Sequence, residues 1–296
     1  MDGKMVEYLQ KVKADYDDEL YFKDIDSKYR EWIQNVTSGT DKKILNELFY
    51  NLRFFSKKEI KSLLKEKMIV FKKDNNNFNT TALLPLTPID GRYSGSNEMI
   101  SLVKELDMEE QVKGTRLLPY RDSIINDIKY ADDSNTLIFI DDISGTGGTV
   151  RKFVNYHHKK MQGKKIVFLF LAVTEQAIDE FNSLSKCYTE IEIEFVYCFE
   201  LKKLSAIEIL SKEEFDQLYS MEEGLWGENN RNILGYEQSE LLVLFSHNIP
   251  NNTVSSFWYY SDKDPDKWKR LFVRITAPNR RKQNYSNKKR KQMPNG

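Results

Sequence analysis

The chain has 296 residues, enough for one large or two modest domains with a buried core. Its 45 basic and 45 acidic residues give a net charge of zero, so the whole-molecule charge favours no polyanionic partner. Two cysteines exclude a disulfide-rich secreted domain, and no apolar run approaches the roughly 18 residues of a membrane span. Because the N-terminus also lacks a signal-peptide pattern, we expect a cytoplasmic protein with no membrane partner.

Helical spacing of apolar residues dominates the first 75 residues. One stripe, within residues 44–52, follows the pair Thr40–Asp41, which is typical of a helix N-cap, and a second stripe lies between Ile60 and Met68. We expect a small helical module over residues 1–75 with these stripes facing its core. A winged-helix module is the alternative, for which the lysines of residues 57–67 give weak support.

Strand and helix patterns alternate after a polar segment at residues 72–79. Short apolar runs predict strands at 80–87, 136–140, 166–172 and 191–197, and amphipathic runs predict helices at 95–106, 150–161 and 175–183. This alternation is typical of an α/β domain, a mostly parallel sheet with flanking helices, which we expect over residues 76–277. Ligands of such sheets bind beyond the carboxyl ends of the strands.

The segment after the strand at 136–140 carries the strongest functional signal. Asp141 and Asp142 stand next to each other at the strand's end, and a polar, glycine-rich loop leads from them into a helix. The loop residues are Ser144, Gly145, Thr146, Gly147, Gly148 and Thr149. Carboxylates accept hydrogen bonds from vicinal hydroxyls, and N–H groups at a helix N-terminus favour a phosphate, so we predict a ribose-phosphate site. A dinucleotide fingerprint fails because Val150 replaces its third glycine, and a P-loop fails because no lysine follows the glycines.

The run from Ile140 to Thr149 resembles the signature of type I phosphoribosyltransferases, enzymes that use phosphoribosyl pyrophosphate (PRPP) with Mg²⁺. The resemblance implies that Asp141 and Asp142 bind the ribose hydroxyls and organise Mg²⁺, while the loop of residues 144–149 holds the 5′-phosphate. Gly145 stands where several purine-salvage members carry an aspartate. A purine-salvage reaction that uses this aspartate as its base is therefore not expected.

A second anion site is expected between the strand at 80–87 and the helix at 95–106. Phosphoribosyltransferases have a pyrophosphate-binding loop at a comparable position along their chain. Arg92 would supply positive charge there, and Ser94 and Gly95 would supply donors at the start of the helix. An ordinary turn with a surface arginine is the alternative.

The C-terminal third places hydrogen-bonding residues after an apolar, helix-like run at Leu241–Phe245. His247 is expected to have an acid/base or base-recognising role, with a purely structural turn as the alternative, and Asn251 and Asn252 are expected to bind the ligand. The Gly-Tyr, Pro-Asn-Asn-Thr and Trp residues between 235 and 258 resemble the phosphoribosyltransferase-like conflict effectors of bacteria. That family is associated with anti-phage defence, including retron-type systems, which implies a reverse transcriptase and its DNA–RNA product as restraining partners.

Together, these observations and resemblances predict an effector that binds PRPP or a related ribose 5-phosphate ligand with Mg²⁺. We expect it to transfer phosphoribosyl to an unknown acceptor and to be toxic when activated. The alternatives are a non-catalytic PRPP- or nucleotide-sensing subunit that binds nucleic acid or a protein, and a pure assembly subunit. We expect residues 278–296, with seven basic and no acidic residues, to form a disordered arm that solvates the chain or attracts nucleic acid. His157 and His158 are expected to be exposed polar positions.

Overall fold

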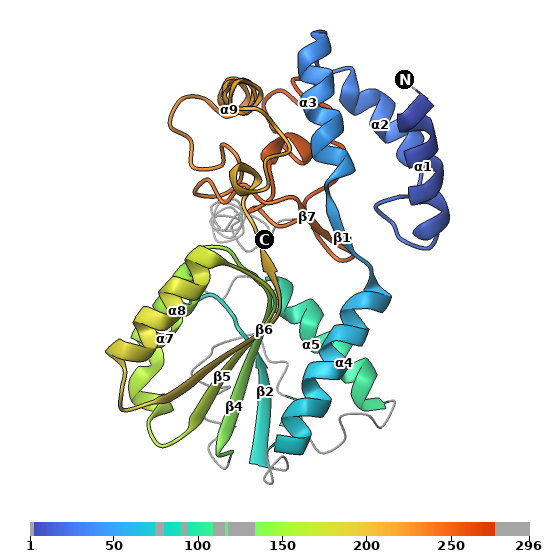
Figure 1. The fold of residues 1–296 in the computed structure, drawn as a ribbon. Helices are drawn as coiled ribbons and strands as arrows, with labels where there is room; N and C mark the ends of the chain where they lie inside the picture. The colour runs from blue at the N-terminus through green and yellow to red at the C-terminus, as the bar shows by residue number, and fades with distance from the viewer. Residues whose placement is uncertain (1–2, 75–79, 90–93, 109–115, 118–133, 276–296) are drawn as a thin grey trace, which may run out of the picture.

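A computed structural model describes residues 3–74, 80–89, 94–108, 116–117 and 134–275. These residues form two units, which Figure 1 shows one above the other. We call residues 55–201 the sheet unit, and residues 3–54 together with 204–275 the helical unit. The expected α/β class and the helical N-terminal region are confirmed.

The sheet unit contains a parallel five-stranded sheet in the order β3-β2-β4-β5-β6. Its strands are β2 (Thr81–Pro85), β3 (Arg116–Leu117), β4 (Thr136–Ser144), β5 (Lys165–Thr174) and β6 (Glu192–Leu201). The first and third strands of the sheet along the chain, β2 and β4, are neighbours, with Leu83 opposite Ile138. Strand order therefore reverses between β2 and β4, the place where open α/β sheets bind ligands.

Helices cover both faces of this sheet, as Figure 1 shows. They are α4 (Lys57–Asp74) and α5 (Gly95–Met108) on one face, and α7 (Gly148–Met161) and α8 (Glu175–Cys187) on the other. Alternate residues of β4 supply the two cores, because successive side chains of a strand point to opposite faces. Ile138 and Ile140 pack in the cluster with α4 and α5, whereas Leu137 and Phe139 pack in the cluster with α7 and α8.

The helical unit is built from both ends of the described chain. Its helices are α1 (Gly3–Asp15), α2 (Ile25–Ile33), α3 (Gly39–Tyr50) and α9 (Lys212–Trp226), with the 3₁₀ turns η2 (Leu204–Ala206) and η3 (Ser255–Phe257). One apolar cluster joins residues 5–54 to residues 204–272. The division of the chain into 1–75, 76–277 and 278–296 stays a prediction. The N-cap of α3 is Ser38, whose hydroxyl accepts from the backbone N–H groups of Thr40 and Asp41.

A small parallel sheet links the two units. It pairs β1 (Arg53–Phe55) with β7 (Val243–Phe245), and Phe54 lies opposite Leu244. Phe54 and Leu244 belong to the core of the helical unit, whereas Phe55 and Phe245 belong to a core of the sheet unit. The expectation of a helix-like run at Leu241–Phe245 is therefore wrong, because Val243–Phe245 pair with a strand about 190 positions earlier and Leu241 forms a bridge with Thr253.

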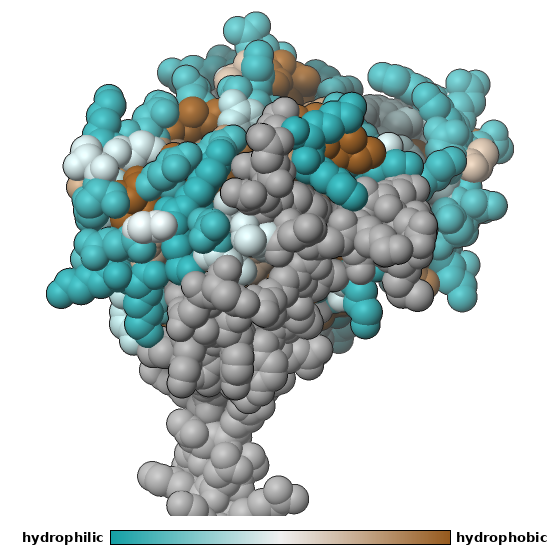
Figure 2. All heavy atoms as spheres, turned by 90° about the horizontal axis from the view of Figure 1, so that it is seen from below, coloured by the Kyte–Doolittle hydropathy of each residue, from teal (hydrophilic) through white to brown (hydrophobic). Residues whose placement is uncertain are grey.

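The described surface is mainly hydrophilic where Figure 2 views the molecule from below, with small separate apolar areas. Across the described residues, none of the helices is both long and apolar enough to cross a bilayer. The basic segment 278–296 lies outside the described residues.

Candidate ligand site

The acidic pair lies at the carboxyl end of β4. This strand continues beyond the residue expected, through Asp141 and Asp142 to Ser144, and both carboxylates are buried at its end. The backbone N–H of Asp142 donates to the Asp141 carboxylate at 3.0 Å. The pair therefore stands at the reversal point between β2 and β4, where the topology favours ligand binding.

The start of α5 meets the acidic pair from the side of β2. The hydroxyls of Ser94 and Ser96 are 2.6 Å apart, and the backbone N–H of Asn97 donates to the carbonyl of Ser94, which closes the first turn. A Cβ added at Gly95 would overlap the carboxylate of Asp142, so a larger residue there would displace that carboxylate. Ser94 and Gly95 thus lie beside the acidic pair, while Arg92 lies outside the described residues.

Opposed effects set the pKa of Asp141. Burial raises it well above its ordinary value, and the neighbouring charge of Asp142 raises it further. The backbone N–H groups of Asp142 and of Ser96, at the start of α5, act in the opposite direction. The pair consequently carries a single negative charge more readily than two, and a bound cation would favour the doubly charged form.

His247 reaches the acidic pair from the helical unit. Its Nε2 lies 2.9 Å from Oδ2 of Asp142, and 9 % of the His247 side chain is exposed. The imidazole stacks on Phe245, the last residue of β7, with ring centroids 5.5 Å apart and an interplanar angle of 6°. The buried Nδ1 has no hydrogen-bond partner among the described residues. The segment after β7 therefore places His247 at the end of β4, in contact with Asp142, which lies 105 positions earlier in the chain.

The glycine-rich loop turns from β4 into α7. Gly147, with φ of 71°, is the residue before the helix, a left-handed conformation that glycine adopts without strain. The hydroxyl of Thr174 donates to the carbonyl of Gly145 and fixes the loop against β5. Ser144, Gly145 and Gly147 are buried, and the remaining loop residues Thr146, Gly148 and Thr149 are partly or fully exposed.

Side chains from two other segments lie over this loop. Asn252 occupies the space where a Cβ of Gly145 would be, and its Nδ2 donates to the hydroxyl of Ser239 at 2.8 Å. The side chain of Glu180, in α8, occupies the space where a Cβ of Gly147 would be, and it forms an ion pair with Arg151. The loop and the acidic pair are thus covered in this conformation, by the helical unit and by α8.

Asn251 is placed differently from Asn252. Its backbone carbonyl accepts from the N–H of Tyr236 at 2.7 Å, and its side chain is half-buried. Within the described parts of the chain, the Asn251 side chain forms no hydrogen bond with residues 144–149. The structure therefore brings together Asp141, Asp142, His247, the loop and Asn252.

Arg274 is a site residue that sequence reasoning missed. The Arg274 side chain is half-buried with its Nε fully buried, and burial lowers the pKa of the guanidinium, an effect that the nearby charges of Asp142 and Tyr21 oppose. Nothing in the local sequence signals this placement, because the surrounding residues form neither a helix nor a strand. A cation therefore stands near the acidic pair, on a segment remote in sequence.

The residues present fit a magnesium ion. Within the described residues, no group of three or more His, Cys, Asp or Glu side chains is close enough to form a protein-only metal site. Mg²⁺ is ordinarily held by one or two carboxylates together with phosphate oxygens of a bound ligand. Asp141 and Asp142 supply hard oxygen donors of this kind.

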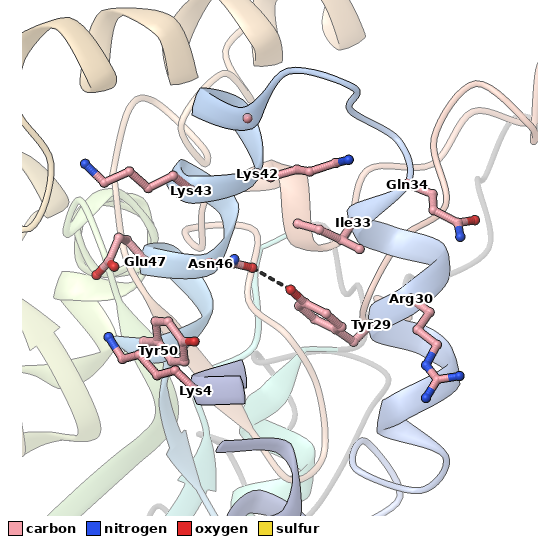
Figure 3. A pocket seen from close by; sticks show the side chains of 11 residues that line it. Lys4, Tyr29, Arg30, Ile33, Gln34, Lys42, Lys43, Asn46, Glu47 and Tyr50 are labelled. Atoms are coloured by element: carbon pink, nitrogen blue, oxygen red, sulfur yellow. Dashed lines mark hydrogen bonds between the residues drawn. The ribbon is translucent and has the colours of Figure 1, made fainter. Parts of the chain in front are cut away.

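A separate hollow of about 600 Å³ lies in the helical unit, among α1, α2 and α3. Figure 3 shows Tyr29 donating a hydrogen bond to Asn46, a bond of 2.6 Å, between α2 and α3. The basic residues Lys4, Arg30, Lys42 and Lys43 also line it. None of its lining residues belongs to the acidic pair or the glycine-rich loop, so the hollow is distinct from the candidate site.

Comparison with known proteins agrees with this arrangement. A family model described as PRTase-CE matches residues 29–274, most of the chain. The chain belongs to the PRTase-CE family. The match includes parts of both units, with β4 and the segment after β7. Among curated proteins there is no match. A phosphoribosyltransferase-like family is therefore established for this chain.

Proposed function

We propose that this PRTase-CE protein binds PRPP at the end of β4 and transfers its phosphoribosyl group to an acceptor. One observation carries the proposal: two adjacent carboxylates and two helix starts, those of α5 and α7, converge at the reversal point of a parallel sheet. A ribose with a phosphate at each end has complementary chemistry, a diol between two anions. Family membership supports the transferase class.

Each group of residues has a distinct role in the proposal. Asp141 and Asp142 accept hydrogen bonds from the ribose hydroxyls. The N–H groups of residues 145–149, at the start of α7, hold the 5′-phosphate, and the start of α5 at Ser94 and Gly95 faces the diphosphate. The covering side chain of Asn252 moves off the loop to admit the phosphate and then contacts it.

The transfer breaks one bond at the anomeric carbon and forms another. The bond to the diphosphate oxygen breaks with its electron pair leaving on the diphosphate, and a bond forms to the acceptor atom. The acceptor's proton passes to His247, which Asp142 holds through the 2.9 Å contact. Asp141 and Asp142 would hold Mg²⁺, which would neutralise charge on the diphosphate. The ribose is oriented by the same two carboxylates.

The proposal extends to defence. By its resemblance to bacterial conflict effectors, the protein would be toxic when activated and would be restrained by a reverse transcriptase and its DNA–RNA product. The covering of the acidic pair by His247 is consistent with a restrained state. Growth of bacteria expressing the wild type, with and without such a partner, tests this extension.

The same covering contact favours a second function, a non-catalytic sensor of PRPP or a nucleotide. Because the Asp142–His247 contact joins the two units, a ligand that separates these residues would change how the units fit together. Release of pyrophosphate from PRPP and Mg²⁺ by the wild type, with cell extract as a source of acceptor, separates the two functions. Binding without release supports the sensor.

The central experiment replaces both acids, Asp141→Asn with Asp142→Asn. Loss of the two carboxylates should weaken PRPP binding by about 100-fold or more, because each forms charge-assisted hydrogen bonds to the ligand. Isothermal titration with PRPP and Mg²⁺ measures this, and Asp179→Asn, at an exposed position of α8, is the control. An undiminished affinity in a folded double variant would refute the proposal.

A further inference from the structure

The segment Leu271–Ile275 is fastened beside the acidic pair by hydrogen bonds from three directions. The N–H of Phe272 donates to the carbonyl of Phe257 at 2.9 Å, and the hydroxyl of Tyr21 donates to the carbonyl of Val273 at 2.9 Å. Asn248 and Ile275 bond each other twice, at 3.0 and 2.9 Å. Since Asn248 follows His247, these bonds hold Arg274 next to the residue that contacts Asp142.

Arg274 has an unused donor in this position. Its guanidinium lies over the ring of Trp258, 5.5 Å from the centroid, and its buried Nε has no hydrogen-bond partner among the described residues. Arg274 also forms no ion pair within 4.0 Å with any described residue. A buried donor without an acceptor costs free energy, so an anion that supplied the acceptor would bind favourably.

Asp142 indicates which part of a ligand Arg274 would meet. The Asp142 carboxylate lies against Gly95 at the start of α5, whereas the loop of residues 144–149 leads away from it into α7. The charge of Arg274 acts on Asp142, and Ile275 is bonded to Asn248, next to the histidine that contacts Asp142, so we assign Arg274 to this side of the site. In the proposed binding mode this is the side of the diphosphate, opposite the 5′-phosphate.

We propose that Arg274 binds the diphosphate group of the ligand. The inference rests on the proposed function and deepens it, because it assigns the diphosphate a cation other than Arg92, the arginine expected in this role, which lies outside the described residues. A planar guanidinium can donate two parallel hydrogen bonds to phosphate oxygens. When the bond at the anomeric carbon breaks, the electron pair stays on the diphosphate, and Arg274 stabilises that added charge.

The test compares three ligands with the wild type and Arg274→Gln: PRPP, inorganic pyrophosphate and ribose 5-phosphate, each titrated with Mg²⁺ present. We expect the substitution to weaken binding of PRPP and of pyrophosphate by about 10- to 100-fold, the value of a charge-assisted hydrogen bond, and to leave ribose 5-phosphate unchanged. Arg274→Lys should lose less affinity for PRPP and pyrophosphate, because lysine keeps the positive charge. Arg270→Gln is the matched control, since Arg270 comes just before this segment and lies over the ring of Tyr260, 4.5 Å from its centroid.

The outcomes separate this inference from the proposed function. Unchanged pyrophosphate affinity in Arg274→Gln, or an equal loss for all three ligands, would overturn the role of Arg274 and leave the proposed function standing. A wild type that binds pyrophosphate through Arg274 but does not bind PRPP would overturn the proposed function and keep the anion site. A wild type that binds none of the three would refute both. A thermal unfolding midpoint of Arg274→Gln within the range of the control shows that folding is preserved.

Discussion

Glu222 in the helical unit and His157 in the sheet unit are both buried ionisable side chains with opposite surroundings. Glu222 is 0 % exposed, and its carboxylate accepts from the N–H groups of Leu234 and Ser256, each at 2.6 Å, and from the hydroxyl of Ser255 at 2.7 Å. His157 is 1 % exposed, and neither of its ring nitrogens has a hydrogen-bond partner among the described residues.

This difference reflects how each unit is held together. The sheet unit is stabilised mainly by apolar side chains between a sheet and its helices, so the ring of His157 packs there with Phe153, centroids 4.8 Å apart. The helical unit must fix irregular segments after α9, and Glu222 bonds two of them to that helix. Burial of Glu222 therefore stabilises the helical unit, because its carboxylate has hydrogen-bond partners, whereas burial of His157 without such partners destabilises the sheet unit.

Replacing Glu222 should have the largest effect on stability. Glu222→Ala leaves two backbone N–H groups and one hydroxyl without their acceptor and opens a cavity, so we expect the free energy of unfolding to fall by about 4 kcal/mol. Urea denaturation followed by tryptophan fluorescence measures this, because Trp226 donates to the Ser255 hydroxyl in the same network. Glu228→Ala, at an exposed position, should change stability little. Equal stability of the two variants would contradict the role given to Glu222.

A glycine substitution tests the irregular segment itself. Gly235 has φ of 83°, and an added Cβ would overlap the backbone carbonyl of Asn252, so Gly235→Ala should destabilise the protein by about 2–3 kcal/mol. Gly224 lies in α9 with nothing near an added Cβ, so Gly224→Ala should stabilise by about 1 kcal/mol. Thermal unfolding of both variants checks the predicted change of sign. The same sign for both would show that the backbone conformation at Gly235 is unimportant.

His157→Phe should give a smaller change than Glu222→Ala, and in the opposite direction. The variant keeps an aromatic ring and removes two buried nitrogens without partners, so we expect about 1–2 kcal/mol of added stability. Denaturation at neutral pH measures it, with His158→Phe at the more exposed neighbouring position as the control. Destabilisation by His157→Phe alone would indicate that the nitrogens have partners after all.

The same residue should make wild-type stability depend on pH. Burial, with the positive charge of Lys160 as a lesser cause, lowers the pKa of His157 from 6.5 to about 4. The unfolded chain therefore binds a proton that the folded chain does not, and the stability from neutral His157 is lost as pH falls from about 6.5 towards 4. The stability difference between His157→Phe and the wild type should widen over that interval. A constant difference would contradict the lowered pKa.

Local sequence patterns sufficed for most of the sheet unit. The sequence predicted the strands that begin near residues 81, 136, 165 and 192 and the helices between them. Apolar residues recur there with the spacing of a strand or a helix that packs against a core, so the pattern indicates the element directly. Burial of His157 was missed, although its spacing of four from Phe153 and from Met161 places all three on one helical face. The helical spacing indicated a buried position, but the polar character of histidine favoured an exposed one.

The helical unit was less predictable, because its structure depends on partners distant in sequence. A five-residue apolar run such as Leu241–Phe245 fits either a helix or a strand, and only pairing with β1 decides between them. At the candidate site, Asp141, Asp142 and the loop could be identified from their order alone. The approach of His247 to Asp142, and the placement of Arg274, depend on how the two units pack, which no local pattern reports.

The chain order of the two units has a consequence for synthesis. Because β6 ends at Leu201, the whole described sheet unit leaves the ribosome before β7 and the segment Leu271–Ile275 are made, and domains tend to fold as they emerge. On the nascent chain the carboxylates at the end of β4 are therefore formed before His247 and Arg274 are present. Only a chain translated into its last third carries His247 and Arg274, so a prematurely terminated product would lack both side chains next to the acidic pair.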